Sequence, residues 1–165
     1  MLAVGWLALC CGGVTATVSA QSVVPVLRIH DGAREVGVTL ADIAALPHRQ
    51  LRIAGENSSD TSTVSGVALW DLLQKVGIPS PEASGRQRGA MYVRLAGTDG
   101  QAAMFALAEL DPGFTRKTVL VAEQRDGRPL DGTEGRLRVF VPDDIRHARW
   151  IRGLARIDAG TLPTP

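Results

Sequence analysis

The sequence predicts an α+β domain in which a mixed β-sheet is accompanied by a few short helices. Many short apolar segments are separated by turn residues, two stretches place apolar residues at helical spacing, and no internal repeat divides the chain. About 145 residues follow the first twenty, which is enough for one domain with a sizeable core. We therefore expect residues 21–165 to form a single domain.

Two helices are predicted in the first half of the chain. Thr39 is a typical N-cap for the segment 40–46, and Pro47 ends that segment because proline cannot continue a helix. Gly77 stands at the C-terminal cap position of the segment 68–76. The apolar residues of this second helix recur at helical spacing: Leu69, Leu72, Leu73 and Val76.

The other apolar segments are predicted to be strands, because turn residues separate them and they are rich in β-branched residues. The polar stretch 55–66 and the stretch 79–89 are predicted to be loops, and 106–112 a single helical turn. The predicted strands are 24–29, 35–40, 48–54, 90–97, 101–107, 117–124, 136–141 and 154–159.

The first twenty residues predict an export signal. They contain no charged side chain, and Val18, Ser19 and Ala20 form a small-residue cleavage site before Gln21. We therefore expect residues 1–20 to be removed and the protein to be periplasmic. An uncleaved anchor is the alternative, because the segment lacks the Lys or Arg that usually opens a signal.

Residues 21–165 contain no cysteine, because Cys10 and Cys11 both lie in the predicted signal. This part of the chain therefore has no disulfide, no thiolate nucleophile and no thiolate metal ligand. The histidines are too far apart for a zinc motif, so no metal is expected at His30, His48 and His147.

The balance of charge excludes one broad class of partner. The formal net charge is +1, which gives no general attraction to nucleic acid. Local basic character is expected only in the arginine-rich stretch 136–156.

The segment 141–152, VPDDIRHARWIR, is the most informative part of the chain, and we call it the strand-end segment. Pro142 cannot donate a ladder hydrogen bond, so the preceding strand should stop there and the next side chains should project from its end. Guanidinium groups beside an aromatic face suit a planar heterocycle or an anion. The candidate site residues are Asp143, Asp144, Arg146, His147, Arg149 and Trp150.

Four stretches in order carry a family resemblance: VTLADIAALPHRQLRI; VSGVALWDLLQKVGI; RLAGTDGQAAMFALAEL with VLVAEQRDGRPL; and EGRLRVFVP through RWIRGLARI. Together they resemble the molybdopterin-binding domain of the sulfite-oxidase family over residues 24–159. The resemblance implies that family's fold and a pterin ligand.

The chain differs from this family at the position of the metal-ligating residue. In the full enzymes a cysteine after the strand that follows the LP motif ligates molybdenum, whereas Ile53 or Ala54 stands there in this chain. Neither side chain can bind a metal. Gln101 also replaces the usual aromatic residue of the DGY turn. Small exported proteins of this kind resemble pterin-binding sensors, and some are thought to partner membrane-bound cyclic-di-GMP signalling enzymes.

The resemblance suggests a role for each candidate. Asp143 or Asp144 would accept from the amino and ring N–H groups of a pterin, and Arg146 or Arg149 would donate to its carbonyl or anionic tail. Trp150 would stack on the ring. Solvent-facing acids and a core tryptophan are the alternatives.

Glu56 and Asn57, in the loop at the lost cysteine position, would complete the recognition of the pterin edge, with a plain loop as the alternative. The leading hypothesis is thus an exported, metal-free pterin sensor that acts on a membrane signalling partner. A molybdopterin-dependent oxidoreductase is the first alternative, and a ligand-free interaction domain is the second.

Overall fold

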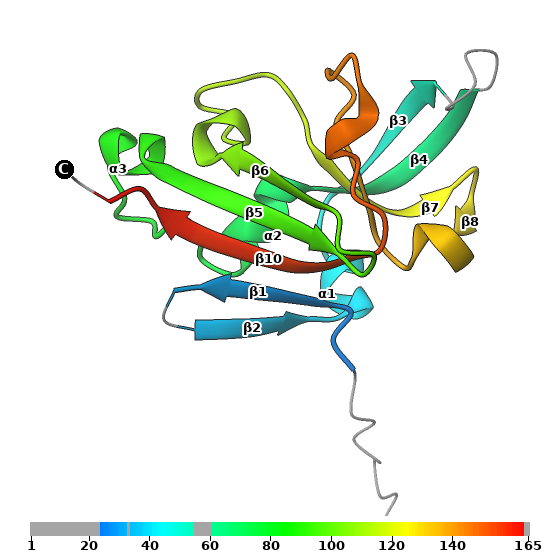
Figure 1. Cartoon of the computed structure of the whole chain (residues 1–165), viewed down its shortest axis with the longest axis horizontal. Coiled ribbons are helices and arrows are strands. Elements are labelled where there is room, and N and C mark those ends of the chain that lie inside the picture. Colours follow the sequence, from blue (N-terminus) through cyan, green and yellow to red (C-terminus); the bar gives the residue numbers. More distant parts are fainter. Residues whose placement is uncertain (1–23, 33, 55–60, 164–165) are drawn as a thin grey trace, which may run out of the picture.

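The computed structural model describes residues 24–32, 34–54 and 61–163. The predicted signal, residues 1–20, and the candidates Glu56 and Asn57 lie outside this part of the chain. The described residues form an α+β structure with two five-stranded sheets and few helices (Figure 1). The fold class is as predicted. The expectation of one mixed sheet is wrong, because the strands divide between two sheets.

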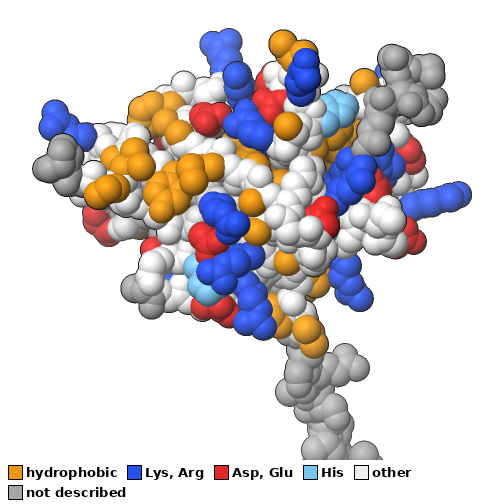
Figure 2. Space-filling view, viewed as in Figure 1, with side chains coloured by type: hydrophobic (Ala, Val, Ile, Leu, Met, Phe, Trp, Pro, Cys, Tyr) orange, Lys and Arg blue, Asp and Glu red, His pale blue; other side chains and the backbone are white. Residues whose placement is uncertain are grey.

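The first sheet has the strand order β2-β1-β10-β5-β6. Strands β1 and β10 pair in parallel, and the other neighbours are antiparallel, so this sheet is mixed. Its outer face is open in Figure 2, where arginines and acids lie beside apolar side chains. Its strands are β1 (Leu27–Asp31), β2 (Arg34–Val38), β5 (Met91–Gly97), β6 (Ala102–Ala106) and β10 (Leu154–Thr161).

The second sheet is antiparallel and has the order β3-β4-β7-β8, with β9 paired to β7. Residues Asp126 and Gly127, both at positive φ, form the two-residue turn between β7 and β8. The strands are β3 (His48–Ala54), β4 (Thr61–Ala68), β7 (Leu120–Arg125), β8 (Arg128–Pro129) and β9 (Arg138–Phe140).

Strand β4 corrects a sequence expectation, because residues 61–66 were predicted to be part of a loop. These residues are mostly polar, but they belong to a strand that pairs with β3 on one side and with β7 on the other. A Cβ on Gly66 would lie 2.1 Å from the backbone oxygen of Val121, so only glycine permits this approach of β4 to β7.

The two predicted helices are present. Helix α1 (Leu40–Ala44) begins at a capping box between Thr39 and Asp42, and helix α2 (Leu69–Lys75) buries its leucine face. Helix α3 (Gly85–Gly89) was predicted to be a loop, and it is set by a capping box between Ser84 and Gln87. Three single 3-10 turns complete the structure: η1 (Leu107–Glu109), η2 (Gly132–Glu134) and η3 (His147–Arg149).

One hydrophobic core is shared by both sheets and α2. Its largest fully buried side chains include Phe105 from the first sheet and Phe140 from the second, and Leu72 and Leu73 from α2 join the same cluster. Residues of β7, β9 and the segment 141–152 belong to the same cluster.

Within the described residues, no helix is both long and apolar enough to cross a membrane.

Candidate functional site

The strand-end segment leaves the second sheet as the sequence predicts. Strand β9 ends at Phe140, two residues before Pro142, and the chain then passes through η3 (Figure 1). The tip of the segment is fully solvated, since Ile145 is completely exposed. Asp143 and Arg146 are exposed beside it.

Arg149 is held by two acids, and we call these three residues the Arg149 cluster. Its Nε and Nη2 donate to the two carboxylate oxygens of Asp144 at 2.8 and 2.7 Å, and its Nη1 donates to Glu109 at 3.2 Å. The hydrogen bonds from Arg149 hold the pKa of Asp144 below its usual value, although burial opposes this. The same hydrogen bonds, accepted by Asp144, raise the pKa of Arg149. The predicted pterin-recognition groups Asp144 and Arg149 thus bond to each other.

Trp150 is a core residue, as the alternative interpretation had it. Its side chain is only 6% exposed, and its Nε1 donates to the Val141 carbonyl at 3.1 Å. His147 stacks on the indole at a centroid distance of 3.6 Å, and Phe140 meets it edge-on at 5.0 Å. His147 therefore covers one face of the ring that the sequence assigned to a ligand.

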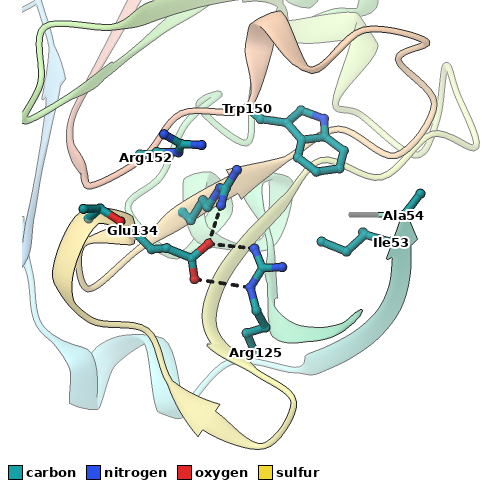
Figure 3. Close-up of a pocket in the computed structure, with 8 residues that line it drawn as sticks. Ile53, Ala54, Arg125, Glu134, Trp150 and Arg152 are labelled. Carbon is teal, nitrogen blue, oxygen red and sulfur yellow. Dashed lines mark hydrogen bonds and ion pairs between the residues drawn. The ribbon is translucent and has the colours of Figure 1, made fainter. Parts of the chain in front are cut away.

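A cavity of about 340 Å³ lies beside Trp150 and is lined by residues of the second sheet and η2 (Figure 3). Ile53 and Ala54, at the end of β3, form part of its wall. These are the positions at which the resemblance would place the metal-ligating cysteine. We call this cavity the arginine pocket, and its lining residues are Ile53, Ala54, Arg125, Thr133, Glu134, Arg138, Trp150 and Arg152.

Glu134 joins two of the arginines in this pocket. Arg125 donates through Nε and Nη2 to the two oxygens of Glu134 at 3.2 and 2.7 Å, and Arg138 donates to Oε1 through Nη1 (Figure 3). Burial opposes ionisation of Glu134, but the two guanidiniums outweigh it and keep the pKa of this carboxyl below its usual value. Glu134 is therefore a carboxylate at neutral pH.

The sheet pairing explains why these charges meet. Arg125 ends β7 and Arg138 begins β9, and these two strands pair antiparallel. Both guanidinium carbons lie over the Phe140 ring, at 5.6 and 5.0 Å from its centroid. Arg138 is only 5% exposed, so Glu134 neutralises a charge that is expensive to bury.

The described residues that line the pocket carry a formal charge of +2, because they include three arginines and one glutamate. Guanidiniums offer fork-shaped donors that match carboxylate, phosphate and sulfate oxygens. Figure 2 shows Lys and Arg side chains grouped with acidic ones over the second sheet. The arrangement suits an anion that also has an apolar part, since Ile53 and Trp150 supply an apolar wall.

Sequence reasoning found only part of this site. The arginine-rich stretch 136–156 was the one region expected to be basic, and Trp150 was a candidate. Arg125 carried no signal of its own, because strand pairing brings it to Arg138, and Glu134 was not singled out although it is only four residues before Arg138.

The described residues do not fit a metal held by the protein. They contain no group of three or more His, Cys, Asp or Glu side chains that could hold an ion. Ile53 and Ala54 offer only hydrocarbon where a thiolate ligand would be needed.

Searches against protein-family models and against curated proteins find no match. Among solved structures, the sulfane dehydrogenase SoxCD from Paracoccus pantotrophus is similar, with a TM-score of 0.60 and 16% sequence identity. The match covers 81% of this chain and 37% of that chain, so this protein spans little more than a third of the dehydrogenase chain. At this identity the likeness establishes a shared fold.

Proposed function

We propose that the protein is an exported binding protein that holds an anionic pterin in the arginine pocket, without a metal ion ligated by the protein. The observation that carries the proposal is the wall of Ile53 and Ala54 beside three guanidiniums. The pocket keeps groups for an anion at the place where it lacks a ligand for the metal.

The pocket has the size and chemistry for such a ligand. A volume of about 340 Å³ is at the lower end of the range for small-molecule sites. Ile53 and Trp150 would border the flat ring, and the guanidiniums would bind the anionic group. Each charge-assisted hydrogen bond that forms away from water contributes about 1.5–3 kcal/mol.

Two further observations support this ligand class. The order of motifs along residues 24–159 resembles a molybdopterin-binding domain, and the fold is shared with a sulfane dehydrogenase. The uncharged first twenty residues support export to the periplasm. As the partner we propose a membrane-bound cyclic-di-GMP signalling enzyme, which the same resemblance implies.

A molybdopterin-dependent oxidoreductase is the second candidate function, and the fold shared with a dehydrogenase favours it. The protein would then bind a cofactor whose own sulfur atoms hold the metal, and the arginines would anchor its anionic groups. Metal content separates this function from the first.

Calorimetric titration of the purified protein with neopterin, its tetrahydro form and neopterin monophosphate tests the proposal. We expect one-site binding at micromolar affinity, tightest for the phosphate ester, and no molybdenum in the native protein. Stoichiometric molybdenum would favour the oxidoreductase. An absence of binding by any pterin, together with an absence of molybdenum, would leave the interaction domain.

A further inference from the structure

We infer that Glu134 is an internal anion that occupies the arginine pocket until a ligand displaces it, so that the pocket selects oxyanion groups with three or more terminal oxygens, such as a phosphate or sulfate ester, over carboxylates. The inference rests on the proposed function, because it concerns the same pocket. It names the group of the ligand that the arginines bind.

The contacts of Glu134 are those of a bound anion. One carboxylate accepts from both donors of the Arg125 fork and from Arg138, and these side chains line the cavity together. A ligand anion that uses the same donors must take them from Glu134. The side chain of Glu134 is 24% exposed, so solvent is available to it once it leaves.

The backbone of η2 cannot move out with the side chain. The Glu134 carbonyl accepts from the backbone N–H of Gly153 at 2.8 Å. A Cβ on Gly135 would lie 2.4 Å from the Cα of Gly153, so the two backbones are in direct contact. Displacement is therefore a rotation of the Glu134 side chain about its own bonds, and the wall of the pocket stays in place.

Because Glu134 is tethered beside the arginines, it limits which anions can bind in the pocket. Glu134 is held at the arginines by the chain, so its effective concentration there is far above that of a free ligand. A free carboxylate ligand offers the arginines the same group as Glu134 but is not tethered. It therefore cannot displace Glu134 at ordinary concentrations. A phosphate or sulfate group has an additional oxygen or charge with which to engage Arg125, Arg138 and Arg152 together.

Variant E134Q tests the inference, because glutamine keeps the shape of the side chain and removes its charge. Its matched control is E109Q, since Glu109 also accepts from an arginine but lies in the Arg149 cluster. Phosphate, sulfate and acetate are titrated into the full-length wild-type protein and both variants by calorimetry. We expect the wild type to bind phosphate and sulfate and to show no saturable binding of acetate.

Removal of the negative charge of Glu134 should strengthen the binding of anions. We expect E134Q to bind phosphate and sulfate at least tenfold more tightly than the wild type and to gain measurable acetate binding, with E109Q unchanged within twofold. Phosphate affinity that is equal or weaker in E134Q would overturn the inference and make Glu134 a static structural partner of the arginines.

A thermal melt covers the case in which E134Q folds poorly. Sulfate should raise the Tm of E134Q more than that of the wild type, because the ion replaces a missing partner of buried Arg138. An equal rise in both proteins would contradict the inference. Variant E134D shortens the side chain and keeps its charge. Its sulfate affinity should lie between those of the wild type and E134Q.

Titrations with neopterin and neopterin monophosphate distinguish this inference from the proposed function. Neopterin monophosphate that binds more tightly than both neopterin and inorganic phosphate identifies a phosphorylated heterocycle as the source of the group. Oxyanion binding with the expected E134Q effect, but with no gain from the pterin, would keep the inference and reject the pterin. An absence of oxyanion binding in every variant would reject the inference, whereas the proposed function would be rejected only if no pterin binds.

Discussion

The Arg149 cluster and the arginine pocket are built from the same chemistry with opposite balances of charge. Each contains a bidentate arginine–carboxylate pair next to a phenylalanine ring. In the Arg149 cluster one arginine bonds to two acids, whereas in the pocket one glutamate bonds to two of the three lining arginines. The first has more acids than arginines, whereas the described lining of the second has more arginines than acids and borders a cavity. The same kind of ion pair therefore stands in two surroundings of opposite charge.

The two regions meet at Trp150, and its removal should have the largest effect. Trp150 lines the pocket, carries His147 on one face and is 6% exposed. We expect Trp150→Ala to lower the free energy of unfolding by about 3–5 kcal/mol, because the change empties a core position. Urea unfolding followed by circular dichroism measures this loss.

Trp150→Phe is the control for that prediction. It keeps an aromatic ring and loses the hydrogen bond to Val141, so we expect a loss of about 1 kcal/mol from that bond in addition to the loss of packing. If Trp150→Ala unfolds within about 1 kcal/mol of the wild type, the indole is a solvent-side ligand platform and not a core residue.

A matched pair of arginine variants separates the two regions directly. Arg138→Met removes a buried donor from the pocket, and Arg149→Met removes the donor of the other cluster while keeping a flexible side chain over Phe105. We expect Arg138→Met to lower phosphate affinity at least tenfold and to cost about 2–3 kcal/mol of stability. Arg149→Met should cost about 1 kcal/mol, because the Arg149 side chain is about a third exposed, and should leave phosphate affinity within twofold.

Calorimetry and urea unfolding of both variants test this contrast. The reverse result, with binding lost in Arg149→Met and kept in Arg138→Met, would return the ligand site to the strand-end segment as the sequence predicted.

The smallest expected effect concerns pH. The pKa of Asp144 is lowered in the folded protein, chiefly by hydrogen bonds from Arg149, so its stabilisation is fully present above the unfolded pKa, near 3.8. It is lost as the pH falls through the lower folded value. We expect the wild type to lose up to about 1 kcal/mol more than Asp144→Asn between pH 6 and pH 3. Unfolding in urea at several pH values measures the difference.

Asp143→Asn is the control for this prediction, since Asp143 is the exposed neighbour of Asp144. A pH dependence that is the same in Asp144→Asn as in the wild type would show that the Asp144–Arg149 pair does not stabilise the native state.

The sequence predicted those elements whose signals are local. The Thr39 cap, the leucine face of α2 and the proline after β9 each act through neighbours a few residues away. It failed at residues 61–66, where a polar stretch becomes a strand only because β3 and β7 pair with it on both sides. Helix α3 was missed for a different reason: its capping box is a local signal, but its short turn has no apolar periodicity.

The same division applies to the site. From the sequence alone it follows that residues 21–165 have no thiolate, that Ile53 and Ala54 stand at the position of the expected metal ligand, and that positive charge gathers in 136–156. The tertiary structure decided which arginines face a cavity and which meet acids. Glu134 and Arg138 are four residues apart, whereas Arg125 is brought to them by the pairing of β7 with β9. Charge type is a property of each residue, whereas the partner of a charge is set by long-range packing.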